Sequence, residues 1–308
     1  MRALSQRCVA AWDRFLFQSC DPSILPVFRI GYAILILVQS SVNWLDAERW
    51  YTDQGVLRTA TAQQILGPSA WSVLYLLPST EWAVRGCLVL LMMHACLLLL
   101  GVYSRWQSAA IFVWLVSFQN RNPMLTDGED TVFRLFAFAM IWLPLDAYWS
   151  IRPQSIRSQL IRSGASARPT LTSVVESAWA MRWVQFEVAA IYASTALCKL
   201  QGNTWHNGTA TWYVSRMSDH YGRWIPSAWF DSFWVSASTT WGALLIELML
   251  PIALWLRPTR KLAIVAGFGL HLGIEFSMNL FLFQWIMMLG LLMFIVPSEW
   301  RFRRTAIA

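Results

Sequence analysis

The chain is dominated by long apolar segments, and their length restricts the folds open to it. A helix needs roughly 20 mostly apolar residues to cross the hydrocarbon core of a bilayer. Eight segments approach or reach that length: residues 27–45, 82–101, 107–119, 131–147, 181–199, 237–256, 262–278 and 280–296. We therefore predict an all-α fold, a polytopic integral membrane helical bundle of about eight transmembrane helices.

The composition supports this class. Charged residues make up 13% of the chain, whereas about a quarter is usual in a soluble domain. The chain also contains 20 tryptophans, which favour the boundary between water and lipid. The net charge of +7 comes from arginines dispersed among apolar runs, a pattern typical of membrane topology rather than of a nucleic-acid surface. We expect the lipid bilayer as a partner and no nucleic acid.

The distribution of positive charge predicts an orientation. With eight helices and the N-terminus inside, about two thirds of the 24 lysines and arginines fall on one side, which the positive-inside rule makes cytoplasmic. Four of these residues, Arg152, Arg157, Arg162 and Arg168, lie in the connection 150–180. We predict residues 1–26 as a cytoplasmic N-terminal segment, 27–297 as the transmembrane domain and 298–308 as a basic cytoplasmic tail. The expected location is a bacterial inner membrane.

The cysteines give no sign of a metal centre. The chain has five, and none stands in a CxxC pair or at another spacing typical of metal ligands. We predict no metal site and no disulfide framework.

Lys199 is the first candidate for chemistry. It ends the apolar segment 181–199 in a chain that otherwise relies on arginine for positive charge. One explanation is a snorkelling cation, with its stem in lipid and its amine in water. Tyr192 and Thr195 lie on about the same helical face, however, and a polar stripe favours a cavity. A desolvated lysine can act as a base, which arginine cannot. We therefore assign Lys199 as a catalytic base and Tyr192 and Thr195 to a cofactor pocket.

A second polar segment runs from Asn120 to Asp130. Amides and a guanidinium at membrane depth usually line a cavity, because lipid would leave them unsatisfied. We accordingly predict that Asn120, Arg121 and Asn122 bind a cofactor, with a purely architectural role as the alternative. Further along, Thr126 and Glu129 have the spacing of a helix capping box.

Ionisable groups inside the apolar segments form the third set. His271 and Glu275 are four residues apart, so they share one helical face that should point into the bundle. We assign His271 a catalytic, orienting role, with a structural hydrogen bond as the alternative. Glu187 and Glu247 could pair with each other or with Arg182, and both are assigned structural roles. Contacts to a substrate are assigned to Trp205, Asp127, Asp130 and Glu275.

The order of these motifs resembles the HTTM family, the membrane-domain family of the vitamin K-dependent gamma-carboxylases and their bacterial relatives. The resemblance covers about residues 20 to 300 and rests on motifs in a fixed order. These are Arg29-Ile-Gly31, Tyr51 to Val56, Asn120-Arg-Asn-Pro123 with Asp127-Gly-x-Asp130, Lys199-Leu200 followed by Trp205, and His271 with Met278-Asn279.

The resemblance implies a reduced vitamin K or menaquinol-like lipid as cofactor and a site on the extracytoplasmic side. In the carboxylases a lysine base starts the reaction of reduced vitamin K with oxygen, and Lys199 matches that lysine by its place before a leucine. Asn120 or Asn122 falls in the segment that meets the quinone. The carboxylases carry a histidine in that segment, but this chain has none between His94 and His206. We therefore expect quinone or isoprenoid-lipid chemistry rather than glutamate carboxylation.

Two functions follow from these residues. The first is a quinol-dependent membrane enzyme, a lyase or an oxidoreductase, with Lys199 as its base. The alternative is a non-catalytic membrane factor for the maturation, export or immunity of a secreted peptide, which would bind to the aromatic loops outside the membrane. Replacement of Lys199 by arginine separates the two, since it abolishes a base and preserves a positive charge.

Overall fold

The computed structural model is helical almost throughout, and a strand pair of two residues each, β1 (Ser19–Cys20) and β2 (Glu176–Ser177), is antiparallel. The structure describes residues 2–17, 19–146, 149–151, 176–218, 221–222 and 224–300. Two compact units are present, Met1–Arg182 and Trp183–Ala308, and the boundary falls inside helix α9 (Trp179–Lys199).

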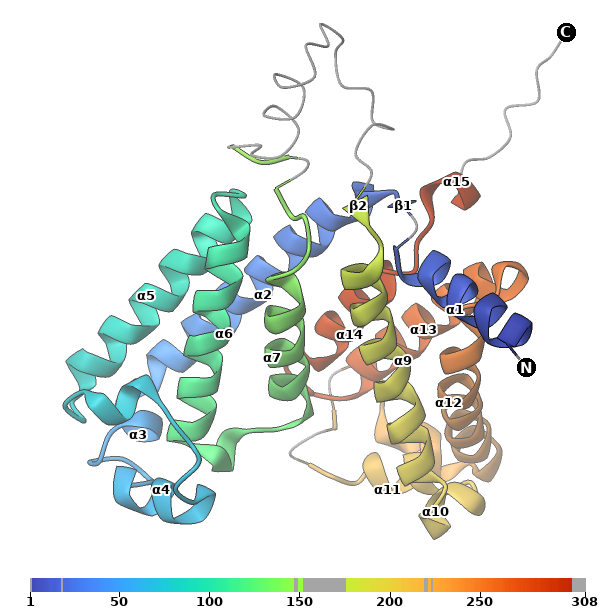
Figure 1. Cartoon of the computed structure of the whole chain (residues 1–308). Helices are drawn as coiled ribbons and strands as arrows, with labels where there is room; N and C mark the ends of the chain where they lie inside the picture. Colours follow the sequence, from blue (N-terminus) through green and yellow to red (C-terminus); the bar gives the residue numbers. More distant parts are fainter. Residues whose placement is uncertain are drawn as a thin grey trace, which may run out of the picture. The chain divides into compact units, whose positions relative to one another are not determined.

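Unit 1 is built on four helices that pair in succession. These are α2 (Leu25–Leu45), α5 (Glu81–Leu99), α6 (Ser104–Arg121) and α7 (Gly128–Met140). Helix α2 packs on α5, α5 on α6, and α6 on α7 (Figure 1). The smaller elements are α1 (Arg2–Phe17), η1 (Pro22–Ile24), α3 (Ala47–Tyr51), α4 (Thr59–Leu66), η2 (Val73–Leu76) and η3 (Pro123–Leu125).

Aromatic side chains fill the core of unit 1 between α2 and α7. Phe28 lies against Phe136 with 5.5 Å between ring centroids, and Tyr32 lies 5.8 Å from Phe133. All four side chains are fully buried. The Tyr32 hydroxyl donates to the main-chain oxygen of Phe133 at 2.7 Å, so this polar group does not remain unsatisfied in the core.

A buried arginine closes one end of this bundle. Arg29 is fully buried and donates to the main-chain oxygens of Leu145 and Trp149 at 2.7 and 2.5 Å. Gly101 packs against the same guanidinium, because a Cβ built on it would lie 2.5 Å from the Arg29 Nη1 atom. Its φ of +69° is also one that residues with a side chain rarely adopt.

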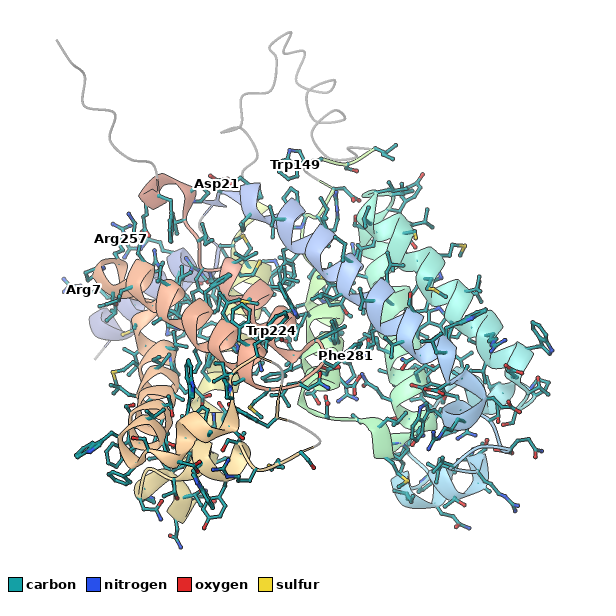
Figure 2. All side chains as sticks on the ribbon, turned by 180° about the vertical axis from the view of Figure 1, so that it is seen from behind. Arg7, Asp21, Trp149, Trp224, Arg257 and Phe281 are labelled. Atoms are coloured by element: carbon teal, nitrogen blue, oxygen red, sulfur yellow. The ribbon has the colours of Figure 1, made fainter. Side chains whose placement is uncertain are left out.

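Unit 2 contains the rest of α9 with α12 (Phe233–Ala253), α13 (Arg257–Ser277) and α14 (Phe283–Leu292). Helix α13 packs on both α12 and α14. Between α13 and α14 the chain turns at Phe281, which has a φ of +26° and is labelled in Figure 2. The short elements are α10 (Asn203–His206), α11 (Ala210–Val214), η4 (Ser227–Asp231) and α15 (Pro297–Trp300).

The structure confirms a helix at each of the eight predicted positions. By length and composition, three helical segments of the described chain can cross a membrane: Pro22–Leu45, Glu81–Leu99 and Phe233–Ala253. Helix α14 is apolar but shorter. The all-helical class is therefore established and three helical segments are candidate membrane spans, whereas eight spans and cytoplasmic termini stay predictions. Most of the basic connection 150–180 and the tail from 301 onward lie outside the described residues.

The packing around Gly101 makes a prediction about stability. Gly101→Ala should lower the midpoint of thermal unfolding by several degrees, because the new methyl group meets the buried Arg29 and the backbone has a positive φ. Gly86→Ala is the matched control. Gly86 lies within α5, where an added Cβ meets nothing within 4 Å, so alanine should be neutral or stabilising. Equal midpoints for both variants would contradict this account.

Candidate functional site

The predicted site residues fall into two groups, one in each unit. Unit 1 holds Asn120, Arg121, Asn122, Asp127 and Asp130. Unit 2 holds Lys199, His271, Tyr192, Thr195, Trp205 and Glu275. Each group is described by itself.

In unit 1, Arg121 is fully buried at the end of α6 and ties down the connection between α3 and α4. Its guanidinium donates to the main-chain oxygen of Leu57 at 2.9 Å and contacts Asp53 at 3.1 Å. Asp53 also accepts hydrogen bonds at 2.7 Å from the backbone and the hydroxyl of Thr59. Close by, Gly55 leaves no room for a Cβ, which would lie 2.1 Å from the Arg49 oxygen. The Tyr51–Val56 motif is therefore a turn fixed by an ion pair and a close backbone contact.

The two asparagines that flank Arg121 also bind main-chain carbonyls. Asn120 Nδ2 donates to Trp71 at 2.7 Å, and Asn122 Nδ2 donates to Trp50 at 2.9 Å. Asn122 Oδ1 accepts from the backbone of Met124 and so caps η3. Both amide groups therefore donate to the protein backbone, and a purely structural role explains why they are present. Quinone binding by Asn120, Arg121 and Asn122 stays a prediction.

The capping box of α7 is displaced by one residue from its predicted position. Asp127, not Thr126, is the N-cap, and its carboxylate accepts from the backbone of Glu129 and Asp130. Asp130 completes the box by accepting from the Asp127 backbone at 3.2 Å. Two aspartates therefore form the capping box that was predicted for threonine and glutamate, because an aspartate carboxylate can accept the same backbone hydrogen bonds.

A small cavity of about 30 Å³ with a mixed polar and apolar lining adjoins this helix end. Its polar lining comes from α2, α6 and the start of α7, and includes Gln39, Gln119 and Asp130. Gln39 donates to the Asp130 carboxylate at 2.9 Å, and Gln119 donates to the Asp130 backbone at 2.9 Å. The volume suffices for about two water molecules, so this cavity is too small for the ring of a quinone.

In unit 2, Lys199 is held by a carboxylate and an indole. Its Nζ atom forms an ion pair with Glu247 of α12 and lies 4.9 Å from the centre of the Trp205 ring. The side chain of Glu247 is 8% exposed and that of Lys199 is 26% exposed. A lysine that only reached for water would not need this buried partner. The pairing considered for Glu187 and Glu247 is not the one observed, since Glu247 bonds Lys199 and Glu187 bonds Trp183.

A second polar chain in unit 2 runs through His271. The Tyr192 hydroxyl lies 2.5 Å from His271 Nε2, and His271 Nδ1 lies 2.5 Å from Gln284 Oε1. With the Gln284 oxygen as acceptor, Nδ1 carries the proton and Nε2 accepts from the tyrosine. Helices α9, α13 and α14 thereby fix one neutral tautomer and one orientation of the ring.

The remaining predicted residues of unit 2 differ in their surroundings. Glu275 is buried one turn after His271 on α13, as the spacing predicted. Thr195 is partly buried and donates to the Tyr192 main-chain oxygen at 3.1 Å, so its hydroxyl is satisfied within its own helix. The Trp205 backbone accepts from the Trp241 indole at 3.1 Å, which fastens the loop that carries the ring over Lys199.

Several buried polar atoms of unit 2 lack a hydrogen-bond partner among the residues that the structure describes, on Glu187, Tyr221, Glu247, Gln284 and Glu299. Two of these atoms, Glu247 Oε2, an acceptor, and Gln284 Nε2, a donor, belong to the two polar chains described above. A buried polar atom without a partner is costly, and the cost is relieved if a ligand supplies the missing partner.

The sequence reading missed Gln284 and misassigned Glu247. A single glutamate inside the apolar run of α12 signals that a cation must lie nearby, and Lys199 ends another apolar helix. That signal was available, but the choice among lysine and arginine candidates required the tertiary structure. Gln284 gave no comparable signal, since an amide at the start of a helix is common.

An α-helical integral membrane protein with a buried polar cluster is the class that this fold and site define. Residues 17–300, nearly the whole chain, match the HTTM domain, and the chain belongs to that family. This makes it a membrane protein of the gamma-carboxylase-like family. No curated protein and no solved structure matches the chain.

The Lys199–Glu247 ion pair predicts that substitutions at the two residues have non-additive effects on stability. Lys199→Met should destabilise the protein by about 3 kcal/mol, because it leaves a buried carboxylate without its cation. Adding Glu247→Leu should recover most of that loss. A double-mutant cycle, with unfolding free energies measured in detergent, tests this. Strictly additive effects of the two substitutions would show that the pair does not interact.

The surroundings of Asp53 predict that the stability of the fold depends on pH. Burial pushes its pKa upward, but the bonds from Thr59 and Ser79 and the charge of Arg121 outweigh burial, so the pKa lies below its ordinary value. The ionised carboxylate therefore stabilises the fold at neutral pH, and that stabilisation disappears as the pH falls through the lowered pKa.

Wild type should consequently unfold at a higher temperature than Asp53→Asn at pH 7, and the difference should shrink below about pH 4. Asp46→Asn is the matched control, since Asp46 is exposed and forms no side-chain cap at α3. Its difference from wild type should stay small at every pH. A constant difference for Asp53→Asn would contradict the assignment.

Proposed function

We propose that the protein is a membrane enzyme that uses a reduced isoprenoid quinone, with Lys199 as the base. The observation that carries the proposal is the arrangement of the unit 2 cluster. A lysine amine is held by a buried carboxylate whose second oxygen has no partner among the described residues, and the chain through His271 ends at Gln284, whose amide nitrogen has none there either. Buried polar atoms are usually satisfied within the protein, so these two atoms are available to a ligand.

The two unpartnered atoms fit the head group of a quinol. A quinol ring offers hydroxyl donors and oxygen acceptors, the complements of Glu247 Oε2 and Gln284 Nε2. The isoprenoid tail of such a lipid would remain in the bilayer. When bound, the reduced quinone supplies reducing equivalents and an ionisable hydroxyl.

The residues of the chain prepare a base for that hydroxyl. Transfer of one proton from Lys199 Nζ to Glu247 leaves a neutral amine with a lone pair, and the pair as a whole remains neutral. The amine then accepts a proton from the bound head group. Trp205 covers the amine and restricts water on that side.

His271 acts as a positioning residue in this proposal. Its ring is held by Tyr192 on one side and Gln284 on the other, so the Gln284 amide is aimed by the ring that binds its oxygen. The wider proposal retains Asn120, Arg121, Asn122, Tyr192 and Thr195 as cofactor contacts, and Trp205, Asp127, Asp130 and Glu275 as substrate contacts. It also places the site on the extracytoplasmic face of a bacterial inner membrane.

One observation favours the alternative of a non-catalytic, peptide-handling factor. The segment from the end of α11 to the first turn of α12 exposes tryptophan rings, with Trp224, Trp229 and Trp234 between 62% and 79% exposed. Trp224 also lines an open hollow of about 600 Å³ with Arg216 and Tyr221. A surface of this kind could hold an extended apolar peptide. On this alternative, replacing Trp224 and Trp229 by alanine abolishes function while Lys199→Arg does not.

The quinol proposal is tested with purified protein in lipid nanodiscs that contain menaquinol. Wild type should retain the quinone, as measured by mass spectrometry of bound lipids, and should consume it in the presence of oxygen. Lys199→Arg keeps the positive charge and should still retain the quinone. Its turnover should fall at least about a hundredfold, because arginine cannot act as the base.

Glu187→Gln is the matched control. Glu187 lies on the same helix but bonds Trp183 instead of the cluster, so both retention and turnover should match wild type. Full turnover in Lys199→Arg would overturn the assignment of the base. If no quinone is enriched with the wild-type protein, the assignment of a quinone as the cofactor is overturned.

A further inference from the structure

A basic hollow lies at the start of α13 and is separate from the polar cluster of unit 2. Arg257, Lys261, Val296 and Glu299 line it, and its volume is about 460 Å³. Arg257, labelled in Figure 2, and Lys261 are exposed. The hollow is large enough for a phosphate-bearing head group, and two cationic side chains form its wall.

Charges around the hollow leave a positive excess. Arg260 is fully engaged, because it donates to the main-chain oxygens of Leu254 and Trp255 and to Glu299 at 2.8 Å. Glu299 is therefore neutralised by Arg260 rather than by the cations of the hollow. Lys261 Nζ lies 5.7 Å from the centre of the Trp300 ring, which leaves its ammonium available to an anion. Among the residues that the structure describes, no acid forms an ion pair with Arg257 or Lys261, so both present positive charge to the hollow.

The hollow lies at a membrane surface, whichever side that is. Helix α12 is one of the three candidate spans and contains 21 residues, which gives it a length of about 31 Å. This length matches the hydrocarbon core of a bilayer. The chain leaves α12 at Ala253 and enters the hollow at Arg257. Arg257 therefore lies at the depth of lipid head groups.

An apolar stripe continues from the hollow along α13. Leu262, Val265, Leu272 and Phe276 recur at helical spacing and are between 37% and 71% exposed. Such a stripe beside a basic hollow matches the two parts of a phospholipid, an anionic head group and an acyl chain. A site for free phosphate would have no need of the apolar part.

We propose that this hollow and stripe bind one anionic phospholipid, with its phosphate between Arg257 and Lys261 and an acyl chain along Leu262 and Val265. Basic pockets at helix ends are a recurrent means of holding anionic head groups. The bound lipid would brace the junction between α12 and α13. The proposal does not depend on the proposed enzymatic function.

The test uses the full chain in nanodiscs made of phosphatidylglycerol and phosphatidylcholine in equal amounts. Lipids that stay bound after transfer to detergent are measured by native mass spectrometry. Wild type should retain phosphatidylglycerol preferentially. Arg257→Gln with Lys261→Gln should reduce that preference about 30-fold, since each charge near the surface contributes about fivefold.

The matched control removes two charges elsewhere. Arg14→Gln with Arg105→Gln alters two exposed arginines of unit 1 and should keep the wild-type preference. Leu262→Ser with Val265→Ser should weaken lipid retention while the charges remain. If the hollow variant retains phosphatidylglycerol like wild type, the proposal is overturned. It is likewise overturned if inorganic phosphate in lipid-free detergent displaces the lipid at millimolar concentration, because the site then recognises a free anion.

Discussion

The ion pair between Lys199 and Glu247 is the contact on which the rest of unit 2 depends. A carboxylate inside an apolar helix is costly unless a cation reaches it, and the cation comes from the last residue of another helix. The pair therefore fixes the end of α9 against α12. The short helix α10, which follows α9, then places Trp205 over the amine. The buried charge of Glu247 must be neutralised for structural reasons. The same pairing produces the candidate site of the unit, because it holds the lysine amine next to a carboxylate.

Unit 1 also contains buried charges, but they are stabilised in a different way. Arg29 and Arg121 are both fully buried, and both donate chiefly to main-chain carbonyls that belong to connections rather than to helices. Such carbonyls need partners when they are removed from water, and a guanidinium can serve several of them at once. The buried charges of unit 1 thus hold loops in place, whereas those of unit 2 face one another.

The sequence predicted some features of the site and missed others for a common reason. Helical spacing placed His271 and Glu275 on one buried face and Tyr192 on the face of Lys199, because spacing within a helix is a local property. The partners of these residues come from other helices, and local spacing says nothing about them. Gln284 was overlooked and Glu247 was assigned the wrong partners on that account. The capping box moved by one residue because aspartate and threonine are both good caps.

The sequence by itself determined the class of the protein, since long apolar segments with little charge can only be satisfied as helices in a membrane. It also determined the family, because motifs spread over nearly the whole chain carry that information. The tertiary structure decided which polar groups meet. It paired Lys199 with Glu247, joined Tyr192 to Gln284 through His271, and turned Asn120 and Asn122 toward main-chain carbonyls. Such contacts join residues far apart in sequence, so they depend on how the helices pack.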